Sequence, residues 1–193
     1  MEKQSVNTII KSITGGFLIG LGGTVFLSVD NRIVGSFLFS LGLLAICTTK
    51  QLLFTGKISY KNKVPFLLII LLSNYIGASA FGICIHYLKP DLAEKALVIC
   101  QNKISEGFLV IPLGIFCNIL IYFAVEGFSK GHGILLILCV MAFILCGFEH
   151  CIANIFYFSV AGIMPIYYIL LNIIGNTIGG LMVRFIRYKT LEE

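Results

Sequence analysis

Long apolar stretches alternate with short polar segments along almost the whole chain. The apolar stretches run approximately over residues 12–29, 33–54, 64–87, 106–125, 133–162 and 165–186. The segments between them are charged or rich in turn residues: VDNR, TGKISYKNK, LKPDLAEK, EGFSKGHG and GIMP. Because a helix needs about 20 apolar residues to cross a bilayer, this pattern predicts an all-α membrane protein with six transmembrane helices.

The composition excludes a soluble globular protein. Of the 193 residues, 58% are apolar and only 12% are charged, with a mean hydropathy of +0.99. Soluble domains carry about 25% charged and 45–50% apolar residues. Six spans fill the chain, so we expect residues 1–193 to form a single transmembrane domain in the lipid bilayer.

The distribution of positive charge predicts the orientation. An even number of spans puts both termini on one side, and ten of the 14 Lys and Arg residues fall on that side. The positive-inside rule therefore predicts cytoplasmic N- and C-termini in a multi-pass protein of the cell membrane (plasma or inner membrane). The net charge of +5 then requires no nucleic-acid partner, and no nucleic-acid-binding motif occurs.

The two halves of the chain, about 12–87 and about 106–187, are weakly similar. Gly16-Phe17-Leu18 is matched by Gly107-Phe108-Leu109, and Asn74-x-x-Gly77 by Asn172-x-x-Gly175. Copies three spans apart are inverted relative to each other, and inverted repeats are typical of transport folds. The alternative is a chance match of glycines in a Gly-rich chain.

Spans two and five each contain residues that a straight helix in lipid would avoid. These are Thr55-Gly56-Lys57 in span two and Gly147-Phe148-Glu149-His150 in span five, with an offset near 95 that makes Thr55 and His150 counterparts. Broken helices persist at membrane depth where they line a cavity or are buried in protein. We therefore predict two broken helices, with Gly56, Gly147 and Glu149 in structural roles at the breaks.

His150 is the leading candidate for function. An ionisable group in mid-membrane usually faces a pathway or an internal partner, and imidazole can hold or release a proton near neutral pH. The alternative is a neutral histidine bonded to a carbonyl that the break leaves free. Glu149 points about 100° away on a helix, so we expect it to bind freed backbone N–H groups or a neighbour.

The remaining polar candidates are open to two interpretations each. Asn118 and Asn154 can line the pathway or join helices. Lys103, before span four, can anchor the chain at the interface or attract anions. Phe39 and Leu43 share one face of span two, and Phe143 lies seven residues before His150; packing is the ordinary interpretation of such apolar side chains.

No catalytic or metal-binding pattern is present. The three histidines do not form H-E-x-x-H, and neither G-x-S-x-G nor a phosphate-binding glycine loop occurs. None of the seven cysteines forms C-x-x-C, so we interpret them as small buried apolar residues. We predict no enzyme activity, no cofactor and no metal.

Together these residues resemble the formate/nitrite transporter family. The resemblance covers about residues 12–187 and is most specific in Gly147-Phe148-Glu149-His150-x-x-Ala153-Asn154. It also includes Leu53-Phe54-Thr55-Gly56, Asn74-x-x-Gly77, Cys117-Asn118 and Asn172-x-x-Gly175-Asn176-x-x-Gly179-Gly180. It implies an aquaporin-like fold, a homopentamer with one pore per subunit, and passage of small monovalent anions such as formate, nitrite or hydrosulfide.

The resemblance also implies roles for particular residues. His150 is similar to the family's central pore histidine, Thr55 to the polar loop threonine, Asn118 to the pore-facing asparagine and Lys103 to the outer lysine. The hydrophobic constrictions correspond to Phe39, Leu43 and Leu53 from span two with Phe143 from span five. The family's usual T-G-N is replaced here by Thr55-Gly56-Lys57.

These observations predict transport of a small monovalent anion with protonation at His150, so that the substrate crosses as its neutral acid. In a simpler variant, His150 and backbone dipoles stabilise the anion without proton transfer. The alternative function is an aquaporin-like channel for small neutral solutes, although the paired N-P-A elements of aquaporins are absent.

Overall fold

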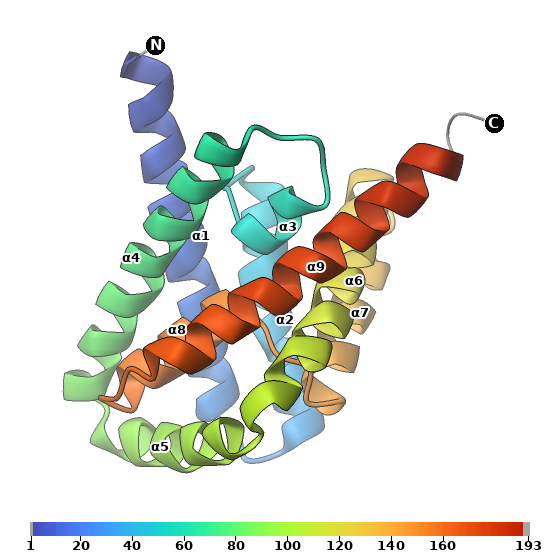
Figure 1. The fold of residues 1–193 in the computed structure, drawn as a ribbon. Helices are drawn as coiled ribbons and strands as arrows, with labels where there is room; N and C mark the ends of the chain where they lie inside the picture. The colour runs from blue at the N-terminus through green and yellow to red at the C-terminus, as the bar shows by residue number, and fades with distance from the viewer. Residues whose placement is uncertain (1, 191–193) are drawn as a thin grey trace.

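The computed structural model describes residues 2–190, which are helical throughout apart from the connecting segments (Figure 1). The helices are α1 (Glu2–Leu27), α2 (Arg32–Thr48), α3 (Phe54–Ile58), α4 (Val64–Leu88), α5 (Pro90–Ser105), the 3-10 helix η1 (Gly107–Leu109), α6 (Val110–Ser129), α7 (Gly133–Leu145), α8 (Cys151–Val160) and α9 (Ile166–Thr190). Within this range, α1, α4, η1–α6 and α9 contain segments long and apolar enough to cross a membrane.

The two ends of the described chain lie at the same end of the molecule. Figure 1 shows the start of α1 and the end of α9 at the top, and α5 lying across the opposite end. The sequence did not lead us to predict α5, because its charged beginning resembles a loop. Its stripe of Leu92, Ala96 and Cys100, spaced by four residues, is buried against the bundle.

The apolar stretches 33–54 and 133–162 are each divided between two helices. The segment 49–53 separates α2 from α3, and 146–150 separates α7 from α8. Both preceding helices end in the same way, with a left-handed residue, Lys50 (φ 55°) or Gly147 (φ 71°). In each case the N–H of that residue and the N–H of the residue after it bond back to the last turn, as in a Schellman motif, which satisfies carbonyls at the helix end.

The two halves pack alike. The helix α1 packs against α4 and α2, as α6 packs against α9 and α7, while α2 and α7 meet in the centre. The closest approaches are at glycines: a Cβ on Gly77 would collide with the Ile13 carbonyl, and one on Gly179 with the Ile115 carbonyl.

The glycine contacts alone do not fix the alignment of the halves. The contact of Gly77 with Ile13 is matched by Gly179 with Ile115 at an offset of 102 residues, and equally by Gly175 with Ile111 at an offset of 98. The sequence matches suggested offsets of 91 and 98. Gly107 cannot correspond to Gly16, because it lies in η1, outside α6, with φ of 55°. Glycine is frequent in this chain, and the match in sequence was not a match in packing.

The short helices α8 and α3 differ in length and burial. All ten residues of α8 are buried, where α8 packs against α4, α1, α5 and α9. The helix α3 has only five residues and contacts α4, α6 and α9. Within the described chain, α8 is therefore more completely surrounded by the apolar core than α3 is.

Candidate functional site

An asparagine holds the start of each short helix. Asn74 of α4 accepts a hydrogen bond from the Phe54 N–H (2.8 Å) and donates to the carbonyls of Leu52 (2.9 Å) and Ser12 (2.6 Å). An amide side chain supplies both an acceptor and two donors, which suits it to backbone groups left without helical partners. We call this arrangement the asparagine clamp.

Asn176 of α9 makes the same set of bonds in the second half. It accepts from the Cys151 N–H (2.9 Å) and donates to the carbonyls of Glu149 and Gly114 (both 2.8 Å). The counterpart of Asn74 is therefore Asn176, and not Asn172 as the sequence match suggested. Asn172 instead donates to the Glu149 carbonyl at 2.8 Å.

The two clamps also correct the predicted pairing of Thr55 with His150. Each clamp fixes the residue that caps its short helix, and these residues are Leu53 before α3 and His150 before α8. His150 therefore corresponds in backbone position to Leu53. Thr55 lies two residues further on, within the first turn of α3.

Thr55 and His150 nevertheless meet in space. The Thr55 Oγ1 lies 2.9 Å from the His150 Nε2, and both side chains are almost completely buried. The other ring nitrogen, Nδ1, accepts a hydrogen bond from the Ala153 N–H at 3.1 Å, which caps α8. A nitrogen that accepts carries no proton, so the ring is neutral with its proton on Nε2. The Nε2–H then donates to Thr55, and the threonine hydroxyl keeps its own proton for another acceptor.

Aromatic side chains surround this pair on one side. The ring of Phe143 lies 6.0 Å from the His150 ring in a stacked arrangement, and 6.0 Å from the Phe39 ring edge-to-face. Leu43, one turn further along α2, and Leu53 are both buried. All four residues of the predicted constrictions thus lie in the core near the two non-helical segments.

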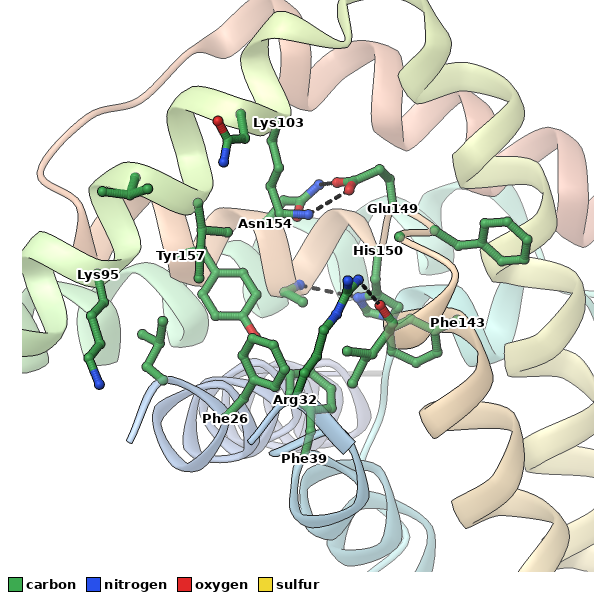
Figure 2. A pocket seen from close by; sticks show the side chains of 18 of the residues that line it. Phe26, Arg32, Phe39, Lys95, Lys103, Phe143, Glu149, His150, Asn154 and Tyr157 are labelled. Atoms are coloured by element: carbon green, nitrogen blue, oxygen red, sulfur yellow. Dashed lines mark hydrogen bonds and ion pairs between the residues drawn. The ribbon is translucent and has the colours of Figure 1, made fainter. Parts of the chain in front are cut away.

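A cavity of about 700 Å³ leads from the α5 end of the molecule to these rings. Figure 2 shows Phe39, Phe143 and His150 together on one side of it, and Lys103, Glu149 and Asn154 gathered on another. Residues from α1, α2, α5, α7 and α8 line it. We call it the outer cavity.

An ion pair lies in the wall of the outer cavity. Lys103 donates to Glu149 at 2.5 Å, with the side chains only 17% and 2% exposed. The second carboxylate oxygen of Glu149 accepts from Asn154 at 2.6 Å, and Asn154 also donates to Asn172 at 2.7 Å. Glu149 therefore binds neighbouring side chains, one of the two roles considered for it, and Asn154 both lines the cavity and joins helices.

Charged residues that the sequence analysis did not single out lie at the rim. The Arg32 guanidinium donates to the carbonyls of Ile144 (2.9 Å) and Leu145 (3.3 Å), where it satisfies the end of α7 (Figure 2). Lys95 pairs with Asp30 at 2.8 Å, and this hydrogen-bonded ammonium lowers the pKa of Asp30 below its usual range. Lys95 lies on α5, the helix that the sequence did not lead us to predict.

Two other predicted residues lie behind Thr55. With its amide nitrogen toward the Thr55 carbonyl, Asn118 donates at 3.2 Å and accepts from the Ser59 hydroxyl at 3.2 Å, so its bonds join α6 to α3. Gly56 does not need to be glycine at this point, because a Cβ there would make an ordinary 3.6 Å contact with Val125. The conformational role expected of glycine belongs to Gly147, with its positive φ.

The cysteines are unpaired, and three depart from the expected burial. Cys100, Cys117, Cys139 and Cys151 are buried, whereas Cys47 is half-buried and Cys84 and Cys146 are exposed. Within residues 2–190, no group of three or more His, Cys, Asp or Glu side chains is placed to hold a metal ion.

The sequence and the fold both match known proteins. The family model "Formate/nitrite transporter" matches residues 1–189. The formate channel FocB of Escherichia coli (strain K12) is 28% identical over 190 residues, which cover 81% of this chain and 67% of that protein. The formate-nitrite transporter of Plasmodium falciparum is 27% identical over 82% of this chain and 66% of its own length. The chain thus spans about two thirds of the length of these relatives.

Solved structures agree with the sequence comparison. A structure described as a pentameric formate channel with formate bound superposes with a TM-score of 0.85 at 25% identity, covering 100% of this chain and 99% of that one. An ion channel of the same family superposes with a TM-score of 0.83 at 19% identity, which supports the fold alone. This is a family of membrane transporters and not of enzymes, as the sequence predicted. The chain belongs to the formate/nitrite transporter family.

Proposed function

We propose that this protein carries small monovalent anions, of the formate, nitrite or hydrosulfide type, across the cell membrane. The family and the formate channels among the relatives support anion transport. The formate channel that superposes on this chain is a pentamer, and we propose that this chain also assembles as a homopentamer. The excess of Lys and Arg on the side of both termini supports their cytoplasmic location.

We further propose six membrane crossings arranged as two inverted repeats. In this interpretation α2 with α3, and α7 with α8, are the two broken spans, and the other four are α1, α4, α6 and α9. The repeated asparagine clamps, which relate Asn74 to Asn176, support it. Transport sites typically form where such broken helices meet near the bilayer midplane.

The proposed route passes from the outer cavity between Phe39 and Phe143 to the Thr55–His150 pair, and on past Leu53 toward the cytoplasm. Lys103 is the group that we propose to attract the anion in the cavity, and it shares its charge with Glu149. A bare anion loses several kcal/mol of hydration in an apolar constriction, more than one or two hydrogen bonds return. Neutralising the anion removes most of that cost, which is why we favour passage as the neutral acid.

The observation that carries this proposal is the bonding of His150. Since Nδ1 accepts from Ala153 and Nε2–H donates to Thr55, the free hydroxyl proton of Thr55 can donate to an arriving anion. If the anion takes that proton, Thr55 recovers one from Nε2, and a solvent proton entering through the outer cavity, which His150 lines, must add to Nδ1 for the ring to remain neutral. The Ala153 bond to Nδ1 then has to break. In the simpler variant the pair only hydrogen-bonds the anion, and the cap of α8 stays intact.

Flux measurements in liposomes test this proposal. Purified protein would be reconstituted and uptake of formate, nitrite and hydrosulfide followed across an imposed pH gradient, with an internal pH dye. We expect saturable uptake of at least one anion, with acidification of the lumen in step. Uptake without acidification supports the variant that moves no proton. Passage of water or glycerol without any anion would overturn the proposal and favour a channel for neutral solutes.

A variant of His150 separates its chemistry from its structural bond. His150→Asn retains a side chain that can cap α8, because asparagine is a favoured N-cap residue, but removes the Nε2 donor. We expect anion flux to fall at least tenfold while the protein folds and reconstitutes like the wild type. Unchanged flux in His150→Asn would contradict the role assigned to the imidazole.

A further inference from the structure

A second cavity lies at the opposite end of the molecule from the outer cavity. It has a volume of about 620 Å³ and is bounded by the segment after α3 and by the last turns of α9. Figure 1 shows these two parts close to the end where the described chain begins and finishes. Its walls include Tyr60, Lys61, Leu181, Arg184, Phe185 and Arg187. We call it the inner cavity.

The inner cavity follows from the difference in length between the two short helices. In the second half, the ten residues of α8 pack along α4 and α1. In the first half, α3 ends after five residues and touches α9 and α6 only briefly. The end of α9 therefore lacks the helical neighbour that α4 has, and a hollow remains beside it.

Positive charge dominates this hollow. In the chain as far as it is described, Lys61 and Arg184 have no hydrogen-bond or ion-pair partner, and no Asp or Glu is among the lining residues. Arg187 is held in place, with its guanidinium 5.0 Å over the Tyr60 ring and 3.8 Å from Glu126. Glu126 also binds Tyr60 and Lys130, so its charge is already shared. An anion fits this site better than a cation or a neutral molecule.

The apolar surface of α9 leads directly to the same cavity. Residues three or four apart along this helix are exposed and apolar, and they end in two that line the cavity: Leu170, Ile174, Ile178, Leu181 and Phe185. This stripe runs along a helix long and apolar enough to cross the bilayer. A ligand that uses both features must have an anionic head and an apolar tail.

We propose that the inner cavity binds an anionic phospholipid of the cytoplasmic leaflet. Its phosphate lies between Lys61 and Arg184, and its acyl chains follow the exposed stripe of α9. Guanidinium binds phosphate through paired N–H donors, whereas lysine contributes a point charge. Basic pockets on the cytoplasmic side of membrane helices recognise such headgroups. The site is separate from the proposed anion route and does not depend on it.

Native mass spectrometry of the delipidated full chain in detergent tests this site. Phosphatidylglycerol and phosphatidylcholine would be titrated against the wild type, Arg184→Gln and Lys61→Gln. Lys63→Gln is the matched control, because it removes one positive charge from the same connecting segment without touching the cavity. We expect phosphatidylglycerol to bind in preference to phosphatidylcholine. Its affinity should fall about fivefold or more in Arg184→Gln and Lys61→Gln, and remain at the wild-type value in Lys63→Gln.

Several results would overturn the proposal. Equal weakening in all three variants would indicate attraction to surface charge in general and not a site. Full competition by inorganic phosphate would identify a soluble anion as the occupant, because the acyl chains would then contribute nothing. Loss of the oligomer in Arg184→Gln, without any change in lipid affinity, would show that a second copy of the chain covers this face. None of these measurements requires that the protein transport anions.

Discussion

In both halves of the molecule a helix ends at a residue with positive φ, the chain runs extended for a few residues, and a short helix begins. Asn74 binds the start of α3 and Asn176 binds the start of α8, through the same three kinds of backbone hydrogen bond. The two segments differ in what precedes the restart, Leu52-Leu53 in one half and Glu149-His150 in the other.

This difference separates the construction of the site from its chemistry. The clamps bind backbone atoms, so they place no demand on the side chains beside them. In the first segment the residue before the short helix is apolar: Leu53 is buried in the core. The second places an imidazole and a carboxylate at the same backbone positions. The titratable groups near the centre are therefore concentrated in one half, and the other half contributes the Thr55 hydroxyl.

The largest effect is expected from breaking the buried ion pair of the second segment. Lys103→Met would leave the buried Glu149 carboxylate without its positively charged partner, at a cost of about 3–5 kcal/mol. Thermal unfolding in detergent would show this as a large loss of stability. The control is Lys95→Met, which removes a lysine of the same helix that is 48% exposed and should change stability little.

A double substitution sharpens this test. Lys103→Met combined with Glu149→Gln removes both charges, so the double variant should be more stable than Lys103→Met alone. If the double variant loses as much stability as the two single variants together, Lys103 and Glu149 do not act as a pair. The second segment would then not differ from the first by a stabilising buried ion pair.

The sequence predicted the parts of this arrangement that depend on local properties. Length and apolarity are read within a single stretch, so the four long helices followed from the hydropathy pattern. The importance of Thr55 and His150 was also predicted, from the polar character of each in an apolar stretch. Their contact across 95 residues, at 2.9 Å, is compatible with that prediction.

Features that depend on distant contacts were not predictable in detail. The predicted matches of Gly16 with Gly107 and of Asn74 with Asn172 failed because Gly and Asn recur often enough to align by chance. The backbone bonds of Asn74 and Asn176 identify these two residues as counterparts. The partner of Glu149 is 46 residues away on α5, a helix hidden by its charged beginning. The buried stripe of Leu92, Ala96 and Cys100 was the signal that could have revealed that helix.

The two clamps are expected to be of similar strength. Asn74→Ala leaves the Phe54 N–H without its partner, and Asn176→Ala does the same to the Cys151 N–H, at about 1–3 kcal/mol for each buried group. Asn74→Ala should be at least as destabilising, because the Glu149 carbonyl keeps its bond from Asn172 in the second clamp. The measurement is again the melting temperature in detergent.

The control for the clamps is Asn102→Ala, at an exposed asparagine of α5, which should melt like the wild type. Strong destabilisation by only one of Asn74→Ala and Asn176→Ala would contradict the view that both segments share one construction.

A smaller effect, on flux more than on stability, is expected at Thr55. Thr55→Val removes the hydroxyl that receives the Nε2–H of His150, whereas Thr55→Ser keeps it. One lost hydrogen bond of about 1.5 kcal/mol corresponds to roughly a tenfold lower anion flux. We expect that decrease in Thr55→Val liposomes and near wild-type flux in Thr55→Ser. Equal flux in both variants would show that the Thr55 hydroxyl takes no part in transport and that only the second segment supplies reacting groups.

The smallest effect is expected at the rim of the outer cavity, where charge is exposed. The Asp30 side chain is 94% exposed, and its pairing with Lys95 lowers the pKa of its carboxyl. A carboxyl with a lowered pKa in the folded state contributes stability above its unfolded pKa of about 3.9 and loses it as the pH falls through the folded value. Any stabilisation that Asp30→Asn removes should thus be present at pH 5–8 and begin to decline as the pH falls below about 4. Solvent and salt screen so exposed a pair, so the melting temperatures of Asp30→Asn and the wild type should nearly coincide at pH 7 in 0.15 M salt.

A decrease in melting temperature at pH 7 as large as that of Lys103→Met would show that the rim, and not the buried pair, holds α5 over the second segment.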